Sequence, residues 1–414
     1  MKEFIFLNIE DPEKLEKLYR SNKVLFKKEF NAIYSEIEKF PAAGFWNERL
    51  NFEQQEISWG AKNELSFIVV LSLLAGIIAK IPEILTINTE FFYTRNIGFI
   101  VFPFLAIYFS WKYSLNNKRA LIAFLSMTIS LLWINFFPAN SSSDTLVLSC
   151  IHLPLFLWVI VGFVFSGDKL ASYERRLEYL RFNGDLIVMV ALLLISGAIM
   201  TGITIGLFNM IGSEITEFYF RNIVILGLAA SPIVGTYLVQ SNPHLVNKVS
   251  PVIAKIFTPL VLITLVIYLL AIVVSGKDPY NDREFLMIFN ALLVGVMALI
   301  FFSIAETSRS SKSNSGMMAL LALSVVTIIL NGIALSAIVF RLYEWGITPN
   351  RLAILGGNIL MFAHLLVITK NIFKFVKDKV GLNSIEKSIA IFLPVYALWT
   401  IVVTFIFPLI FHFK

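Results

Sequence analysis

The chain has 414 residues, of which 57% are hydrophobic and 15% charged, and its formal net charge is +6. A soluble domain carries about 25% charged residues, so this composition excludes an ordinary water-soluble fold. The apolar residues come in blocks of about 20, the length that crosses the hydrocarbon core of a bilayer. The basic residues are scattered between these blocks without interleaved aromatics, which argues against nucleic-acid binding. We therefore predict an all-α, polytopic transmembrane helix bundle whose first partners are membrane lipids.

Residues 1–64 are rich in charged side chains and predict a cytoplasmic N-terminal helical module. Asp11 followed by Pro12 is typical of a helix start. Hydrophobic residues then recur at a spacing near 3.6, which predicts one amphipathic helix reaching about Phe40. The Pro-Ala-Ala-Gly segment at 41–44 is expected to end it. The first turns contain no apolar stretch of the signal-peptide type, so we expect the N-terminus to stay in the cytoplasm.

The second part of this module, residues 45–64, is mostly polar and leads to the first membrane span. Trp46 and Trp59 are expected to anchor it at the membrane interface. Because about 60 residues bury little surface by themselves, we expect the module to pack on cytoplasmic loops or on a protein partner.

The transmembrane domain is predicted over residues 65–414 and contains about eleven spans. We place them near residues 65–81, 97–111, 120–137, 146–165, 186–211, 222–240, 256–275, 285–304, 317–340, 352–369 and 388–411. Loops on the N-terminal side carry about twice as many Lys and Arg residues as loops on the other side, with the densest at 169–181 and 370–387. The positive-inside rule then places the N-terminus in the cytoplasm and, with an odd number of spans, the C-terminus outside.

An internal repeat is the most informative feature of the sequence. The segment Thr-Glu-Phe-Phe-Tyr-Thr-Arg-Asn-Ile at 89–97 precedes the second predicted span, and Thr-Glu-Phe-Tyr-Phe-Arg-Asn-Ile at 216–223 precedes the sixth. A looser copy at 343–351 precedes the tenth. The period corresponds to four helices, so we predict parallel pseudo-repeats arranged 4+4+3. Parallel repeats of this kind are one way of building transporters.

Each copy of the repeat carries a glutamate and an arginine, and the predicted topology places all of them outside. Two interpretations stay open. The pairs anchor helix ends at the headgroup level, or they converge around the pseudo-axis as an anion-binding mouth in which the arginines donate hydrogen bonds. The candidate ligand-binding residues are Arg95, Arg221, Arg351, Glu90, Glu217 and Glu344.

His364 also belongs to the candidate ligand-binding residues, because it is an ionisable side chain well inside the tenth predicted span. The alternative is a neutral imidazole that is hydrogen-bonded within the bundle. Amide side chains inside the spans allow the same two interpretations, interhelical hydrogen bonding or a polar path for an uncharged or zwitterionic substrate. They are Asn135, Asn209, Asn290, Asn331 and Asn358.

Signatures of enzymes are absent from the sequence. It has no H-E-x-x-H zinc motif, no G-x-S-x-G nucleophile elbow and no phosphate-binding loop. The four histidines lack the spacing of metal ligands, and the single cysteine, Cys150, excludes an intrachain disulfide. The acidic loop at 277–282 is interpreted as a solvated turn, with cation binding as the alternative. We therefore predict no catalytic residue, no metal site and no cofactor.

The segment from Arg341 to Arg351 resembles the signature of a bacterial multipass membrane family catalogued as domain of unknown function 4153. Its pattern is an arginine that ends one span, an aromatic-x-Gly-[Leu/Ile]-Thr turn, and an arginine that opens the next. Here Gly346, Ile347 and Thr348 fit the turn, and Gly346 is expected to adopt a positive φ. The resemblance implies a bacterial cytoplasmic (inner) membrane protein over residues 65–414, and it implies no activity.

Three functions are compatible with these features. The first is a transporter-like or ligand-binding membrane protein with an extracytoplasmic site for a small-molecule or anionic ligand. The second is a non-catalytic accessory or sensory protein whose N-terminal module binds a cytoplasmic partner. The third is a lipid-modifying membrane enzyme that uses His364 or the acidic loop at 277–282.

Overall fold

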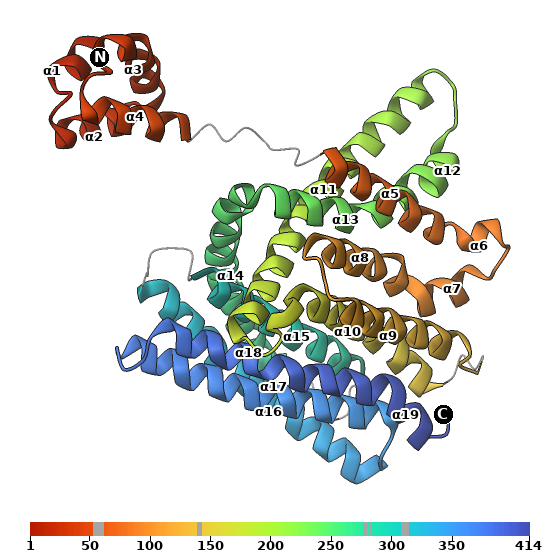
Figure 1. Cartoon of the computed structure of the whole chain (residues 1–414). Helices are drawn as coiled ribbons and strands as arrows, with labels where there is room; N and C mark the ends of the chain where they lie inside the picture. The colour runs from red at the N-terminus through yellow and green to blue at the C-terminus, as the bar shows by residue number, and fades with distance from the viewer. Residues whose placement is uncertain (53–61, 139–142, 276–279, 281–282, 308–313) are drawn as a thin grey trace. The chain divides into compact units, whose positions relative to one another are not determined.

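The computed structural model describes residues 1–52, 62–138, 143–275, 280, 283–307 and 314–414, and these contain helices and turns but no strand (Figure 1). The all-α prediction is therefore confirmed for the described residues. The chain divides into two compact units, Met1–Gly60 and Ala61–Lys414. Each unit has its own hydrophobic core.

The described residues of the first unit, 1–52, form four helices: α1 (Lys2–Leu7), α2 (Pro12–Ser21), α3 (Lys23–Ile37) and α4 (Pro41–Phe52). The predicted start of α2 is confirmed. The side chain of Asp11 accepts a hydrogen bond from the backbone N–H of Lys14 at 3.1 Å, and Pro12 is the first helical residue.

The single helix predicted over residues 11–40 is wrong, because the chain breaks at Asn22. This residue is extended, with φ −158°, and its side chain accepts a hydrogen bond from Leu25 N at 3.0 Å. An asparagine side chain competes for nearby backbone groups in this way and favours a helix start over a helix interior. The predicted end before Pro41 is confirmed, although Pro41 itself opens α4.

Trp46 belongs to the core of the first unit and is 3% exposed. Its ring centroid lies 5.4 Å from that of Tyr19 and 5.1 Å from that of Phe26, and the guanidinium of Arg49 lies 4.7 Å above it. The prediction that Trp46 anchors the chain at a membrane interface is therefore wrong. Trp59, the second predicted anchor, lies outside the described residues.

We predict that the first unit loses stability in acid, because two of its carboxylates have lowered pKa values. The hydrogen bond from Lys14 N lowers the pKa of Asp11, and the hydrogen bond from Arg20 lowers the pKa of Glu16. A lowered native-state pKa stabilises the fold above the unfolded-state pKa of about 4, and this contribution is lost as the pH falls below it. We expect a fragment of residues 1–52 to lose helical circular dichroism in this range. In the Asp11→Asn, Glu16→Gln variant the transition should be shallower, and an identical acid transition would contradict this account.

The second unit contains the remaining helices. They are α5 (Lys62–Ala79), α6 (Ile81–Ile84), α7 (Thr89–Asn96), the 3₁₀-helix η1 (Ile97–Ile100), α8 (Phe102–Lys112), α9 (Asn117–Asn135), α10 (Asp144–Ser166), the 3₁₀-helix η2 (Gly167–Lys169), α11 (Tyr173–Met210), α12 (Thr216–Phe218), the π-helix η3 (Tyr219–Val224), α13 (Ile225–Ser241), α14 (Pro243–Ser275), α15 (Arg283–Thr307), α16 (Asn314–Trp345), α17 (Pro349–Val376), α18 (Leu382–Ile401), the π-helix η4 (Val402–Ile406) and α19 (Phe407–Ile410).

Within the described part of this unit, ten helices are long and apolar enough to cross a membrane. The predicted first span corresponds to a shorter apolar helix, Asn63–Ala79. The chain is thus a polytopic helical membrane protein. The count of eleven spans and the 4+4+3 arrangement stay predictions.

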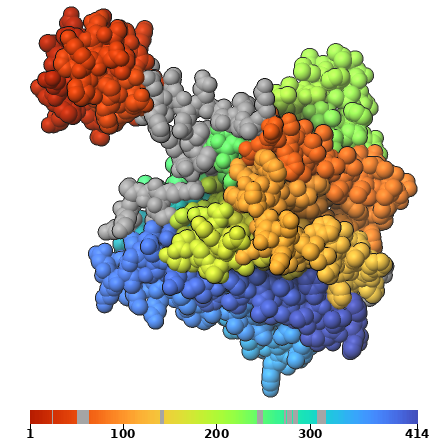
Figure 2. Space-filling model, viewed as in Figure 1, coloured from red at the N-terminus to blue at the C-terminus, as the bar shows by residue number. Residues whose placement is uncertain are grey.

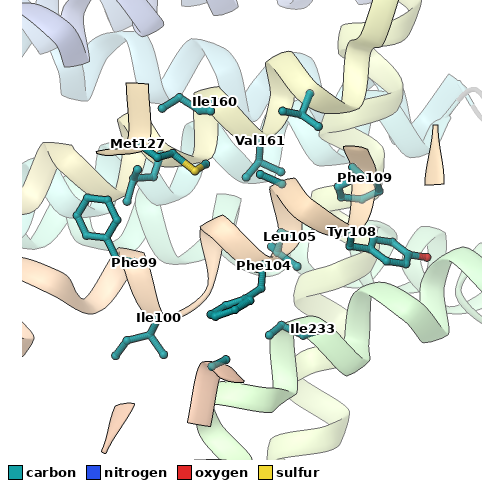
Figure 3. Packing of buried hydrophobic residues seen from close by; sticks show 14 of the residues in the cluster. Phe99, Ile100, Phe104, Leu105, Tyr108, Phe109, Met127, Ile160, Val161 and Ile233 are labelled. Atoms are coloured by element: carbon teal, nitrogen blue, oxygen red, sulfur yellow. The ribbon is translucent and has the colours of Figure 1, made fainter. Parts of the chain in front are cut away.

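Two large hydrophobic clusters and a smaller one around Val403 and Phe407 form the interior of the described part of the second unit. The first is formed mainly by α5, α8, α9, α10, α13 and the beginning of α11, and Figure 3 shows part of it around Tyr108 and Phe109. The second is formed mainly by α14 to α18, around Leu293 and Ile368. Helix α11 connects the two halves, because Gly184 of α11 lies so close to the ring of Phe302 on α15 that an added Cβ would collide with it.

The second half of α11 projects from its neighbours with α12, as the light-green hairpin in Figures 1 and 2 shows. Its apolar side chains are exposed, with Ile199 at 59% and Met210 at 85%. In a bilayer, lipid tails are the natural contacts of such a surface.

The two similar segments at 89–97 and 216–223, from which a repeat was predicted, share a local irregularity. In the first, α7 passes into η1 before α8 begins, and in the second, α12 passes into η3 before α13 begins. At the first break, Gly98 approaches α10 so closely that an added Cβ would lie 2.8 Å from Leu157 and 3.5 Å from the Pro154 backbone. Interrupted helices of this kind frequently occur at functional sites.

The π-helix η4 is hydrogen-bonded to α9 and α10. The backbone carbonyl of Thr404 accepts hydrogen bonds from Trp133 Nε1 at 3.2 Å and from Ser149 Oγ at 3.0 Å. The C-terminal residue is held as well, because Thr145 N donates to the Lys414 carbonyl at 2.9 Å. These bonds give buried backbone and side-chain polar groups partners inside the bundle.

A close approach between α17 and α18 gives a testable packing prediction. A Cβ added at Gly356 would collide with the ring of Trp399, and this large, partly buried ring has little room to move where it packs against α17. We expect Gly356→Ala to lower the free energy of unfolding by about 1–3 kcal/mol. The matched control is Gly197→Ala on α11, where no atom lies within 4 Å of the added Cβ. Equal stability of the two variants in a thermal unfolding assay would contradict this packing.

Candidate functional site

The arginine of the second repeat copy is a surface residue. Arg221 pairs with Glu217 through an Nη2–Oε1 distance of 2.9 Å, and the two side chains are 63% and 77% exposed. Both lie in the short α12–η3 segment. An exposed pair one helical turn apart contributes little to stability and suits a headgroup anchor.

The arginine of the third copy stabilises a turn. Arg351 Nη1 donates to the carbonyls of Trp345 at 2.6 Å and Gly346 at 2.7 Å, and Thr348 caps α17 by accepting from Arg351 N. Gly346 has φ +74°, which confirms the conformation expected from the sequence. Glu344 is exposed. Arg351 thus donates its hydrogen bonds within its own α16–α17 connection.

The arginine of the first copy differs from the other two because it is buried. Arg95 is 5% exposed, and its guanidinium carbon lies 4.3 Å from the ring centroid of Phe91. Its Nε is buried without a hydrogen-bond partner, and no described carboxylate forms an ion pair with it. Glu90, its predicted partner, is exposed. The structure therefore separates Arg95 from the glutamate of its own repeat.

Two helices, α9 and α10, lie beside the end of α7 that carries Arg95. Next to it, Asn96 exchanges two side-chain hydrogen bonds with Asn135 of α9, at 3.0 and 2.7 Å. Directly after α7, η1 packs against α10, where Gly98 lies next to Leu157 and Pro154. The amide pair is self-satisfied, so it supplies no counter-charge to the guanidinium. The carbonyl end of α7 carries a partial negative charge, which compensates for part of the positive charge of Arg95 but not for all of it.

The chemistry of this site follows from the cost of burying an unpaired charge. Removing a guanidinium from water costs several kcal/mol unless an anion or several acceptors compensate for it. A guanidinium presents five donors in a planar fork that matches carboxylate and phosphate oxygens. The buried Arg95 therefore has hydrogen-bonding capacity that suits an anion.

His364 lies elsewhere, in the second half of the unit. It is fully buried; Nδ1 lies 3.1 Å from the Tyr396 hydroxyl and Nε2 lies 3.2 Å from the Ser388 carbonyl oxygen. The ring also stacks on Phe392 at a centroid distance of 4.1 Å. Both nitrogens are thus engaged within the bundle, as the structural interpretation of His364 expects. Its role as a ligand residue stays an untested prediction.

A buried ionic cluster was missed by the sequence analysis. Arg181 of α11 donates from Nη2 to Glu386 of α18 at 2.8 Å and from Nε to the Ala305 carbonyl of α15 at 2.9 Å. Asp185, one turn further along α11, accepts from Ser250 of α14 at 2.6 Å. The sequence interpretation assigned Arg181 and Glu386 to solvated loops. The sequence feature that could have indicated this cluster was the i, i+4 spacing of Arg181 and Asp185, which places both on one helix face.

No group of three metal-ligating side chains occurs among the residues that the structure describes. Of the acidic loop at 277–282, the structure describes Tyr280 alone, so the predicted turn lies outside its scope. Comparison with protein-family models, curated proteins and solved structures finds no match for the chain. The site must therefore be interpreted from its own geometry.

Proposed function

We propose that the chain is a ligand-binding, transporter-like protein of a bacterial inner membrane that binds an anion at Arg95. The observation that carries this proposal is the burial of Arg95 without a counter-charge among the described residues. The other two arginines of the repeat are satisfied locally, by Glu217 and by backbone carbonyls. We therefore propose a site with one arginine in place of an anion-binding mouth made by all three.

The orientation of the site is part of the proposal. The distribution of Lys and Arg over the loops supports a cytoplasmic N-terminus. The segment at 89–97 would then face outward, and the anion would reach Arg95 from the extracytoplasmic side. Membership of the family catalogued as domain of unknown function 4153 is also proposed, and the turn around Gly346 supports it because its φ agrees with the motif.

Native mass spectrometry of the protein released gently from bacterial membranes tests the proposal. We expect a discrete bound mass in the wild type and in Arg221→Gln, and its loss in Arg95→Gln. Arg221 is the matched control, because it occupies the equivalent position of the repeat but is exposed and paired. The same bulk lipids on all three proteins would contradict the anion site.

A second candidate function is that of an accessory or sensory protein, and the first unit favours it. This unit has its own core and exposes apolar side chains on two helices, with Phe4 at 60%, Leu7 at 78% and Phe45 at 65%. Exposed apolar groups on a small unit suit a partner surface. Under this hypothesis, deleting residues 1–60 removes a co-purifying partner, and an unaltered pull-down counts against it. For a lipid-modifying enzyme, no geometry around His364 offers an accessible catalytic group.

A further inference from the structure

Asn331 is a polar residue at the middle depth of the second half of the membrane unit. It lies near the centre of the candidate span Gly316–Trp345 on α16 and is 0% exposed. Neither its side-chain oxygen nor its side-chain nitrogen is hydrogen-bonded to any described group. An amide can make up to four hydrogen bonds, so Asn331 has its full capacity available at a depth where lipid offers no partner.

Other amides of the membrane unit find partners, which makes Asn331 stand out. Asn358 of α17 donates to Asn290 of α15 at 2.7 Å, and Asn290 donates in turn to the Leu286 carbonyl of its own helix at 2.7 Å. The Asn96–Asn135 pair in the first half is reciprocal. Interhelical pairing, the structural explanation for asparagine in a span, therefore holds for these residues and not for Asn331.

The face of α16 that carries Asn331 is polar over two turns. Thr327 and Ser324 are fully buried on the same face, at helical spacings of four and seven residues from Asn331. Each hydroxyl donates to a carbonyl of its own helix, Thr327 to Leu323 at 2.6 Å and Ser324 to Leu321 at 2.9 Å. Their oxygens still have acceptor capacity toward the interior. The side-chain oxygens of Ser324, Thr327 and Asn331 thus form a row of hydrogen-bond acceptors along α16. At the mid-membrane end of this row, the Asn331 amide nitrogen adds two N–H donors.

We infer that Asn331 binds a small uncharged polar ligand between α16 and the neighbouring helices of the second half. The ligand must present a donor and an acceptor side by side, as water, hydroxyl groups and carboxamides do, because the asparagine amide presents both. It must be uncharged, because a charge at this depth is costly without a counter-ion. On the neighbouring α17, His364 lies near mid-span, and it forms a second polar pair with Tyr396 of α18.

Thermal unfolding of purified protein in nanodiscs tests this inference with Asn331→Leu and Asn331→Ala. A bound ligand loses its hydrogen bonds in both variants, so we expect each midpoint to fall by several degrees. The control is Asn358→Leu, which breaks a direct amide pair and should cause a fall of similar size. If Asn331 has no ligand, leucine removes an unsatisfied buried group and raises stability. A midpoint of Asn331→Leu at or above the wild-type value would overturn the inference.

Native mass spectrometry of the same proteins distinguishes two possible ligands, a small solute and water. A discrete small mass on the wild type that is missing from Asn331→Leu identifies a solute. Lowered midpoints without any such mass identify water. Neither readout involves Arg95, so a failure of the anion site and a failure of the Asn331 site are distinguishable.

Discussion

Replacing Glu386 with alanine is expected to lower the free energy of unfolding by about 3 kcal/mol or more. Glu386 is 7% exposed and accepts a charge-assisted hydrogen bond from Arg181. Removing one partner of a buried pair leaves the other charge in a low-dielectric environment without its compensation. The pair also joins α11 to α18, so its loss weakens the contact between the two halves of the membrane unit.

The control for this prediction is the double variant Arg181→Met, Glu386→Met. Because both desolvated charges are removed together, we expect its stability to lie within about 1 kcal/mol of the wild type. Thermal unfolding of the wild type, Arg181→Met, Glu386→Met and the double variant forms a double-mutant cycle. Additive effects of the two single substitutions would contradict a coupled pair.

Replacing Arg95 with methionine is expected to abolish stabilisation by an anion. Binding to the native state alone stabilises the wild type by about 2.7 kcal/mol at a ligand concentration of 100 times the Kd. The ligand-free variant should be more stable than the ligand-free wild type, because it no longer buries a charged side chain whose Nε lacks a hydrogen-bond partner. Thermal unfolding midpoints with inorganic phosphate and with a short-chain phosphatidate measure both effects and distinguish a free anion from a lipid headgroup.

Arg221→Met is the matched control for this experiment. Its guanidinium is exposed and paired with Glu217, so we expect the anion to stabilise this variant as it does the wild type. A loss of anion response in Arg221→Met, or its persistence in Arg95→Met, would remove the support for a site built on Arg95.

Hydropathy and local motifs predicted much of the fold. The helix start at Asp11 and the positive φ of Gly346 follow from local chemistry, and the structure has both. The long apolar segments predicted membrane-spanning helices because lipid allows few other backbone conformations. The break at Asn22 was missed because hydrophobic periodicity continues across it, and only the capping geometry of its side chain reveals the interruption.

The predicted repeat pointed to the candidate arginines, but it did not indicate which of them is buried. The sequences around Arg95 and Arg221 are nearly the same, whereas their exposures are opposite. The difference arises from tertiary packing, since the end of α7 is covered by α9 and α10, and α12 lies in a projecting hairpin (Figure 1). The Arg181–Glu386 pair escaped prediction for a related reason, because its members are far apart in sequence and each reads locally as a loop charge.

The most direct test of the anion site is an experimental density map of the protein purified gently in nanodiscs. We predict density for a bound anionic group within hydrogen-bond distance of the Arg95 guanidinium, between α7, α9 and α10. A guanidinium that instead pairs with a carboxylate of the chain, or extends to the lipid surface, would contradict the central claim.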